Sequence, residues 1–81
     1  MNIKVYDNGG KSIDRYTVVF LDQPELKKGI YAALAMNAHP FDPQGFGQHT
    51  TAMVGRHLGK KITFEELPPD CQKLVRQDLE D

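Results

Sequence analysis

The chain has 81 residues, of which 40% are hydrophobic and 26% charged, and its formal net charge is −1. This length suits one small domain with a limited core, so we expect residues 1–81 to fold as a single unit. The near-neutral charge argues against an extended nucleic-acid footprint, which needs an excess of cations.

The single cysteine and the lack of long apolar runs bear on the cellular compartment of the protein. One cysteine excludes an internal disulfide and a cysteine-based zinc site, and it suits a reducing environment. No apolar run approaches the roughly 20 residues that span a bilayer. The chain also starts with a short alternating run rather than a secretory signal. We therefore expect a cytoplasmic protein without membrane contact.

The first 36 residues predict antiparallel strands. Ile3 to Tyr6 alternates between apolar and polar residues, and residues 15–21 are rich in β-branched and aromatic side chains. The Asp-Asn-Gly-Gly sequence at 7–10 separates the two runs and is a strong turn signal, which predicts an N-terminal hairpin. Residues 30–36 fit a helix by their Ala and Leu content and a strand by their length. We favour a third strand.

The second half predicts two helices and a short strand. Residues 48–58 are expected to form a short helix that ends at Gly59, followed by a brief strand over 60–62. Thr63 to Glu66 has capping-box spacing, and Pro68 and Pro69 suit the start of a terminal helix. Its buried stripe is expected to comprise Cys71, Leu74, Val75 and Leu79. The predicted fold class is therefore α+β, with a small antiparallel sheet (N-terminal hairpin plus third strand) and a C-terminal helix packed on it.

The segment 37–50 is the strongest candidate for function. It has no helical or strand period, yet it is rich in aromatic, amide and imidazole side chains. Ordering such a loop costs about 1–2 kcal/mol per residue in backbone entropy, so packing or a partner must offset that cost. Gly45 and Gly47 would let the backbone present Phe46 for stacking or for a protein interface. The alternative is that Phe41 or Phe46 plugs the core, which we expect of at least one ring.

No catalytic or metal-binding constellation stands out. The spacing of His39, Asp42, His49 and His57 matches no zinc motif. Cys71 lies on the apolar stripe of the last helix, where an inert thiol is expected. Asp7 and Asp14 flank the first turn and have ordinary roles there, Asp7 in turn hydrogen bonds and Asp14 in a salt bridge with Arg15. We expect no catalytic residues, no metal and no cofactor.

Three strings resemble a signature of small proteins from phages and bacterial mobile elements for which no activity is established. They are DNGGK at 7–11 followed by DRYTVV at 14–19, PQGFGQH at 43–49, and LGKKI at 58–62. The resemblance covers most of the chain. It implies no catalytic residues, and it favours a binding protein, including an inhibitor of host defence.

The leading hypothesis is a non-enzymatic binding module that engages a protein partner through the 37–50 loop, with a homodimer as an open alternative. A second hypothesis is a nucleotide-sequestering protein in which Arg56, Lys60 and Lys61 neutralise phosphate while Phe46 stacks on a base. A weaker alternative is a metal-dependent hydrolase or nuclease. The candidate binding residues are His39, Phe41, Asp42, Gln44, Phe46, Gln48, His49, Arg56 and Lys60.

Overall fold

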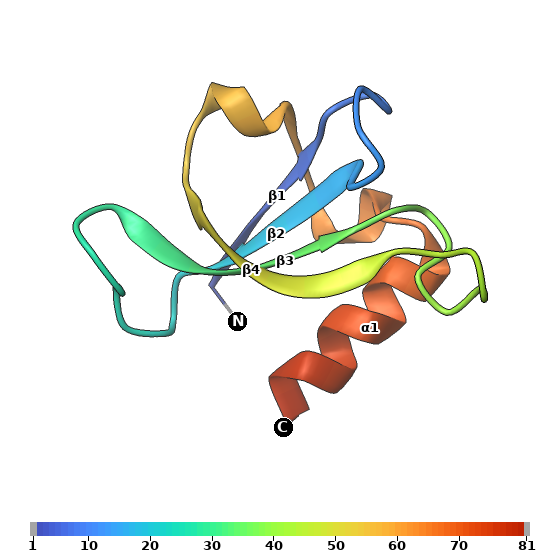
Figure 1. Ribbon diagram of the computed structural model, residues 1–81. Coiled ribbons are helices and arrows are strands. Elements are labelled where there is room, and N and C mark those ends of the chain that lie inside the picture. Colours follow the sequence, from blue (N-terminus) through green and yellow to red (C-terminus); the bar gives the residue numbers. More distant parts are fainter. Residues whose placement is uncertain (1, 81) are drawn as a thin grey trace.

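The computed structural model describes residues 2–80, which form a five-stranded antiparallel sheet and a C-terminal helix (Figure 1). The strand order is β4-β3-β2-β1-β5, so the chain meanders through four strands and then pairs its fifth strand with its first. The α+β class, the hairpin and the terminal helix are confirmed. The elements are β1 (Ile3–Asp7), β2 (Tyr16–Phe20), β3 (Ile30–Met36), β4 (Gly47–Met53), η1 (Arg56–Leu58), β5 (Lys60–Ile62), η2 (Phe64–Glu66) and α1 (Pro69–Glu80).

The N-terminal hairpin forms as the turn signal predicts, with Val5 of β1 opposite Val18 of β2. The side-chain oxygen of Asn8 holds its turn, because it accepts hydrogen bonds from the backbone N–H groups of Gly10 at 2.8 Å and Lys11 at 3.0 Å. Gly10 has a φ of 88°, a conformation that costs glycine little and other residues much more. Local chemistry therefore fixes this turn.

Residues 30–36 form the strand β3 rather than a helix. It pairs with β4 along its whole length and with β2 over residues 33–36, so the backbone groups of this central part are satisfied on both sides. Ala33 and Ala35 are buried, at 0% and 3% exposure. Such small side chains let another segment pass close above the sheet.

The helix predicted over residues 48–58 is wrong. This segment is the edge strand β4 followed by the 3-10 turn η1, and all seven residues of β4 pair with β3. Thr50 and Thr51 are β-branched and Gly55 is a poor helix former, so an isolated helix here would be marginal. The ladder offered by β3 therefore decides the conformation. As a consequence, the predicted 37–50 loop ends at Phe46.

Helix α1 covers one face of the sheet and builds the main core. Alternate residues of the strands point to this face, among them Val18 and Leu34, and they pack against Cys71 and Val75 of α1. All four side chains are at most 2% exposed. Leu67 closes the cluster at the start of the helix.

The opposite face is covered by the segment that links β4 to β5. These are the two outer strands, so residues 54–59 have to cross over the sheet. Figure 1 shows η1, in orange-yellow, on the side of the sheet away from α1. Val54 and Leu58 of this crossover pack on Tyr6, Val19 and Ala33 and form a second, smaller core cluster.

The C-terminal helix begins at Pro69, as the paired prolines predict. The Thr63 side chain makes no capping hydrogen bond, and its capping-box sequence forms the short η2 instead. Fewer residues of the predicted apolar stripe of α1 are buried than their spacing suggests. Cys71 and Val75 are fully buried, whereas Leu79 is 41% exposed.

This difference along one helix is testable. Val75→Ala removes two methyl groups from a fully buried site, so we expect it to lower the free energy of unfolding by about 2 kcal/mol. Leu79→Ala should change it by no more than about 0.5 kcal/mol, because that side chain is exposed. Urea denaturation followed by circular dichroism measures both. Equal losses in the two variants would contradict the packing of α1 described above.

Candidate functional site

The loop between β3 and β4, residues 37–46, is shaped by its own hydrogen bonds. The Asn37 N–H donates to the carbonyl oxygen of Phe46 at 2.9 Å and closes the loop. Inside it, the side-chain oxygen of Asp42 accepts from the N–H of Gln44 at 2.9 Å. A Cβ on Gly45 would lie 1.8 Å from the His39 carbonyl oxygen, so only glycine fits there. The fold therefore orders this loop without needing a partner.

Neither aromatic ring of the loop belongs to the two core clusters of the described residues. Phe41 is 46% exposed, and the Nζ of Lys73 on α1 lies 5.3 Å from its ring centroid, in a cation–π contact. Phe46 is half-buried where the loop joins β4. The expectation that at least one ring plugs the core is wrong, because strands and helix fill it themselves. Phe41 is left as an exposed apolar surface.

Strand β4 is an open edge of the sheet. It pairs with β3 only, and among residues 2–80 no segment pairs with its outer side. Six of its seven residues are exposed, including Gln48 and His49. The His49 Nε2 contacts the Asp78 carboxylate, which ties the middle of the strand to α1. His49 is thus a structural tether as well as an exposed side chain.

This edge lacks the usual devices that protect edge strands. Natural sheets blunt free edges with Lys, Pro, bulges or short strands. The sequence of β4, Gly-Gln-His-Thr-Thr-Ala-Met, holds no Lys and no Pro, and its register with β3 runs without interruption from Gly47 to Met53. Alternate residues along this seven-residue strand therefore present unpaired backbone groups to solvent in strand geometry.

A hollow of about 340 Å³ adjoins the C-terminal half of β4. It is lined by Thr51, Ala52 and Met53 of the strand, by Ile30 of β3, and by His57 and Leu58 of the crossover. Apolar side chains dominate this lining. Met53 is also 51% exposed. An unpaired strand edge and an apolar recess thus lie side by side.

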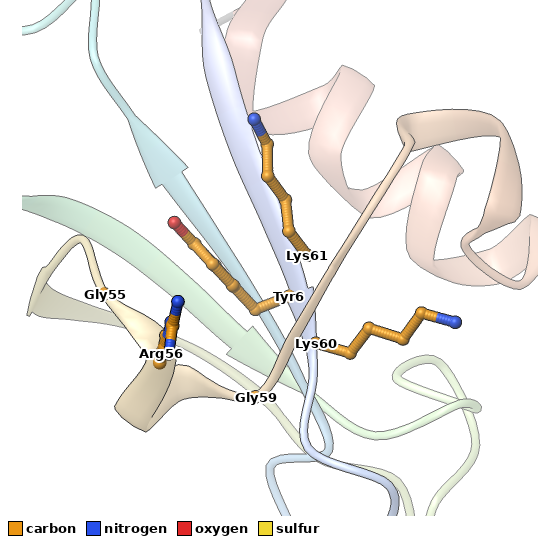
Figure 2. Close-up of a pocket in the computed structure, with 6 residues that line it drawn as sticks. All are labelled: Tyr6, Gly55, Arg56, Gly59, Lys60 and Lys61. Carbon is orange, nitrogen blue, oxygen red and sulfur yellow. The ribbon is translucent and has the colours of Figure 1, made fainter.

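The basic residues gather at the other edge of the sheet, around a second hollow of about 540 Å³. It is lined by Tyr6, Gly55, Arg56, Gly59, Lys60 and Lys61. Figure 2 shows the ends of Tyr6, Arg56 and Lys61 on one side of the strands, while the Lys60 side chain extends to the other side. Phe46 is not among the lining residues.

The structure thus splits the predicted site residues into three groups. The β3–β4 loop holds His39, Phe41, Asp42, Gln44 and Phe46. Strand β4 holds Gln48 and His49. The basic hollow is bordered by Arg56 and Lys60. A single site that unites Phe46 with the cations is not formed. Arg56, Lys60 and Lys61 are the cations predicted to neutralise phosphate, whereas Tyr6 is not predicted from the sequence. The only sequence signal for Tyr6 is the strand alternation that directs it away from Val5.

Asp7 is engaged in the fold and does not stand free for chemistry. Arg15 donates from Nε to Oδ1 of Asp7 at 2.8 Å and from Nη2 to Oδ2 at 3.1 Å. The Arg15 hydrogen bonds hold the pKa of this carboxyl below its ordinary value, against a smaller opposing effect of burial. The predicted pairing of Arg15 with Asp14 is wrong, since Asp14 accepts from the Ser12 hydroxyl at 2.5 Å.

Across residues 2–80, no group of three or more His, Cys, Asp or Glu side chains is placed to hold a metal ion. Within the same range, no helix combines the length and the apolar character needed to cross a bilayer. His39, His49 and His57 lie in the loop, on β4 and in η1, respectively.

Comparison of the chain with protein-family models, with curated proteins and with solved structures found no match in any of the three. The resemblance to small proteins of phages and mobile elements therefore stays a prediction.

Cys71 is placed as an inert thiol. It is fully buried, and its Sγ donates to the carbonyl oxygen of Asn37 at 3.1 Å, which links α1 to the end of β3. Burial, with a smaller effect of the Asp70 charge, raises the pKa of the thiol to about 11. The reactive thiolate is therefore scarce at neutral pH.

We expect this thiol to react slowly with a disulfide reagent such as DTNB. Relative to the ordinary thiol value of 9.0, a pKa of about 11 reduces the thiolate fraction at pH 8 about 100-fold. Burial should slow the reaction further. The measurement compares labelling rates in the native state and in urea. A native rate within tenfold of the unfolded one would show that Cys71 is accessible.

Proposed function

We propose that this chain is a non-enzymatic binding module that takes an extended segment of a partner protein as an added strand along β4. The observation that carries the proposal is the exposed seven-residue edge, which lacks Lys and Pro. In strand addition, main-chain hydrogen bonds supply affinity and pockets for alternate side chains supply specificity. The free backbone edge of β4 offers the main-chain hydrogen bonds, and the hollow beside it offers a pocket for a side chain.

The hydrogen-bond pattern of the ladder identifies the backbone groups that are free. Asn37 donates its N–H to Phe46, and that pair continues the register of β3 with β4. In an antiparallel ladder, hydrogen-bonded and non-hydrogen-bonded pairs alternate. Residues 48, 50 and 52 therefore direct their N–H groups to β3, whereas Gly47, His49, Thr51 and Met53 direct theirs outward. These four N–H groups, with the carbonyl groups of the same residues, can bond to an added strand.

The apolar hollow beside Thr51 and Met53 favours a partner of different sequence over a second copy. Two copies of β4 paired around Thr50 would place Gly47 to His49 opposite the hollow. None of these residues offers a large apolar side chain to fill it. We therefore assign the recess to an apolar side chain of a partner strand, while Phe41 provides a further apolar contact at the loop end.

The nature of the partner rests on the sequence resemblance alone. Proteins of phages and mobile elements act inside a host, so the resemblance would make the partner a host protein, including a component of host defence. The proposal of strand addition does not depend on this point. It depends on the free edge.

Proline at position 51 tests the strand addition. Thr51→Pro removes an outward N–H while sparing the ladder with β3, and proline is tolerated at such edge positions. We expect the affinity for a captured partner to fall at least about tenfold, because one hydrogen bond is lost and the ring obstructs the edge. Thr51→Ala keeps the N–H and serves as the matched control, with a loss of less than about threefold.

Two further measurements complete this test. Light scattering of the purified protein reports whether the edge is taken by a second copy, an outcome that would overturn the assignment to a foreign partner. Hydrogen exchange in the complex should show new protection among the outward amides of Gly47, His49, Thr51 and Met53. Protection confined to other elements, or equal capture by all variants, would refute strand addition along β4.

A further inference from the structure

The basic hollow holds a polar group that the fold does not use. Tyr6 is only 5% exposed, yet its hydroxyl makes no hydrogen bond within residues 2–80. No fully buried polar side-chain atom lacks a partner in that range, so the hydroxyl oxygen opens to solvent at the hollow. Buried tyrosines usually find a hydrogen-bond partner. The hydroxyl of Tyr6 is therefore free for a ligand.

Two cations line the same hollow as this hydroxyl. Lys61 lies opposite Tyr6 in the β1–β5 register, so both side chains project from the same face. Arg56 comes from η1, and Figure 2 shows its side chain extending towards the same side as Tyr6 and Lys61. Neither cation takes part in an ion pair with any residue from 2 to 80. Their charges are left uncompensated at the mouth of the hollow.

Glycines let the crossover approach β1 and give the hollow its shape. Gly59 has a φ of 114°, and a Cβ there would lie 2.4 Å from the carbonyl oxygen of Asp7. A Cβ on Gly55 would lie 2.9 Å from Nδ1 of His57. Gly59 is therefore a position that only glycine tolerates, whereas a side chain at Gly55 would have to displace only the exposed His57 ring. The resulting hollow, about 540 Å³, falls within the size range of small-molecule sites.

We propose that this hollow binds a small phosphorylated molecule, with the phosphate held by Arg56, Lys61 and the Tyr6 hydroxyl. A phosphate dianion matches two cations and a neutral donor, and guanidinium groups pair with phosphate oxygens in a bidentate manner. No carboxylate lines the hollow to repel it. The volume exceeds that of a phosphate alone, so a sugar or nucleoside has room beside the Tyr6 ring.

The charge pattern favours a small molecule over a nucleic-acid strand. Polymer binding needs a series of cations along a track and gains affinity from many phosphates. Here Arg56 and Lys61 are two isolated cations beside one hollow, and the chain as a whole carries a net charge of −1. The site lies at β5, at the opposite edge of the sheet from β4. It shares no lining residue with the hollow beside β4, although the crossover contributes to both.

The test is a titration of the whole protein with inorganic phosphate, ribose 5-phosphate and AMP, followed by NMR chemical shifts and calorimetry. We expect saturable binding of the organic phosphates, with shifts concentrated at Tyr6, Gly55 and Gly59. Lys61→Gln and Arg56→Gln should each weaken binding at least about fivefold, and Tyr6→Phe about threefold, through lost charge-assisted hydrogen bonds.

Lys28→Gln is the matched control. Lys28 carries the same charge as Lys61 and is exposed, but it does not line the hollow. A built site predicts a loss of less than about twofold in this variant, whereas unspecific charge attraction predicts equal losses for both lysines. Equal losses, no saturation up to about 10 mM of any probe, or tighter binding of a single-stranded oligonucleotide would each overturn the proposal.

Discussion

The connection between β4 and β5 is the constraint on which the rest of the structure depends. The two strands lie at opposite edges of a five-stranded sheet, about 19 Å apart if the sheet were flat. Residues 54–59 join them, and part of this length is a 3-10 turn that rises only about 2 Å per residue. The crossover therefore has little slack. It must lie directly on the sheet, where Val54 and Leu58 bury the face that α1 leaves uncovered.

Both candidate sites follow from this path. Because the chain leaves β4 by crossing over the sheet, it does not return along the outer side of that strand, and the edge stays open. Because the crossover meets β1 at Gly59, it leaves a recess above Tyr6 rather than a packed seam. A single connection thus creates an exposed edge at one end and a cation-lined hollow at the other.

Sequence patterns predict the parts of the fold that are decided locally. The Asn-Gly-Gly turn identifies the first hairpin, and the paired prolines identify the start of α1. Strand β4 escapes prediction because Gln48 to Thr51 are exposed, so no apolar alternation marks them. Only pairing with β3 makes this segment a strand. The sites depend in the same way on register, since Lys61 and not Lys60 faces Tyr6 only because of how β5 pairs with β1.

The pairing of β1 with β5 also bears on the order of folding. Val5 pairs with Ile62, so the first strand receives its second neighbour only after most of the chain has been synthesised. Contacts of such sequence separation form late, because loop closure precedes their gain. On the ribosome, β1 to β4 can meander while both faces of the sheet are still bare. The emerging chain would then expose two apolar surfaces until the crossover and α1 arrive, and this interval is when it would most need a chaperone.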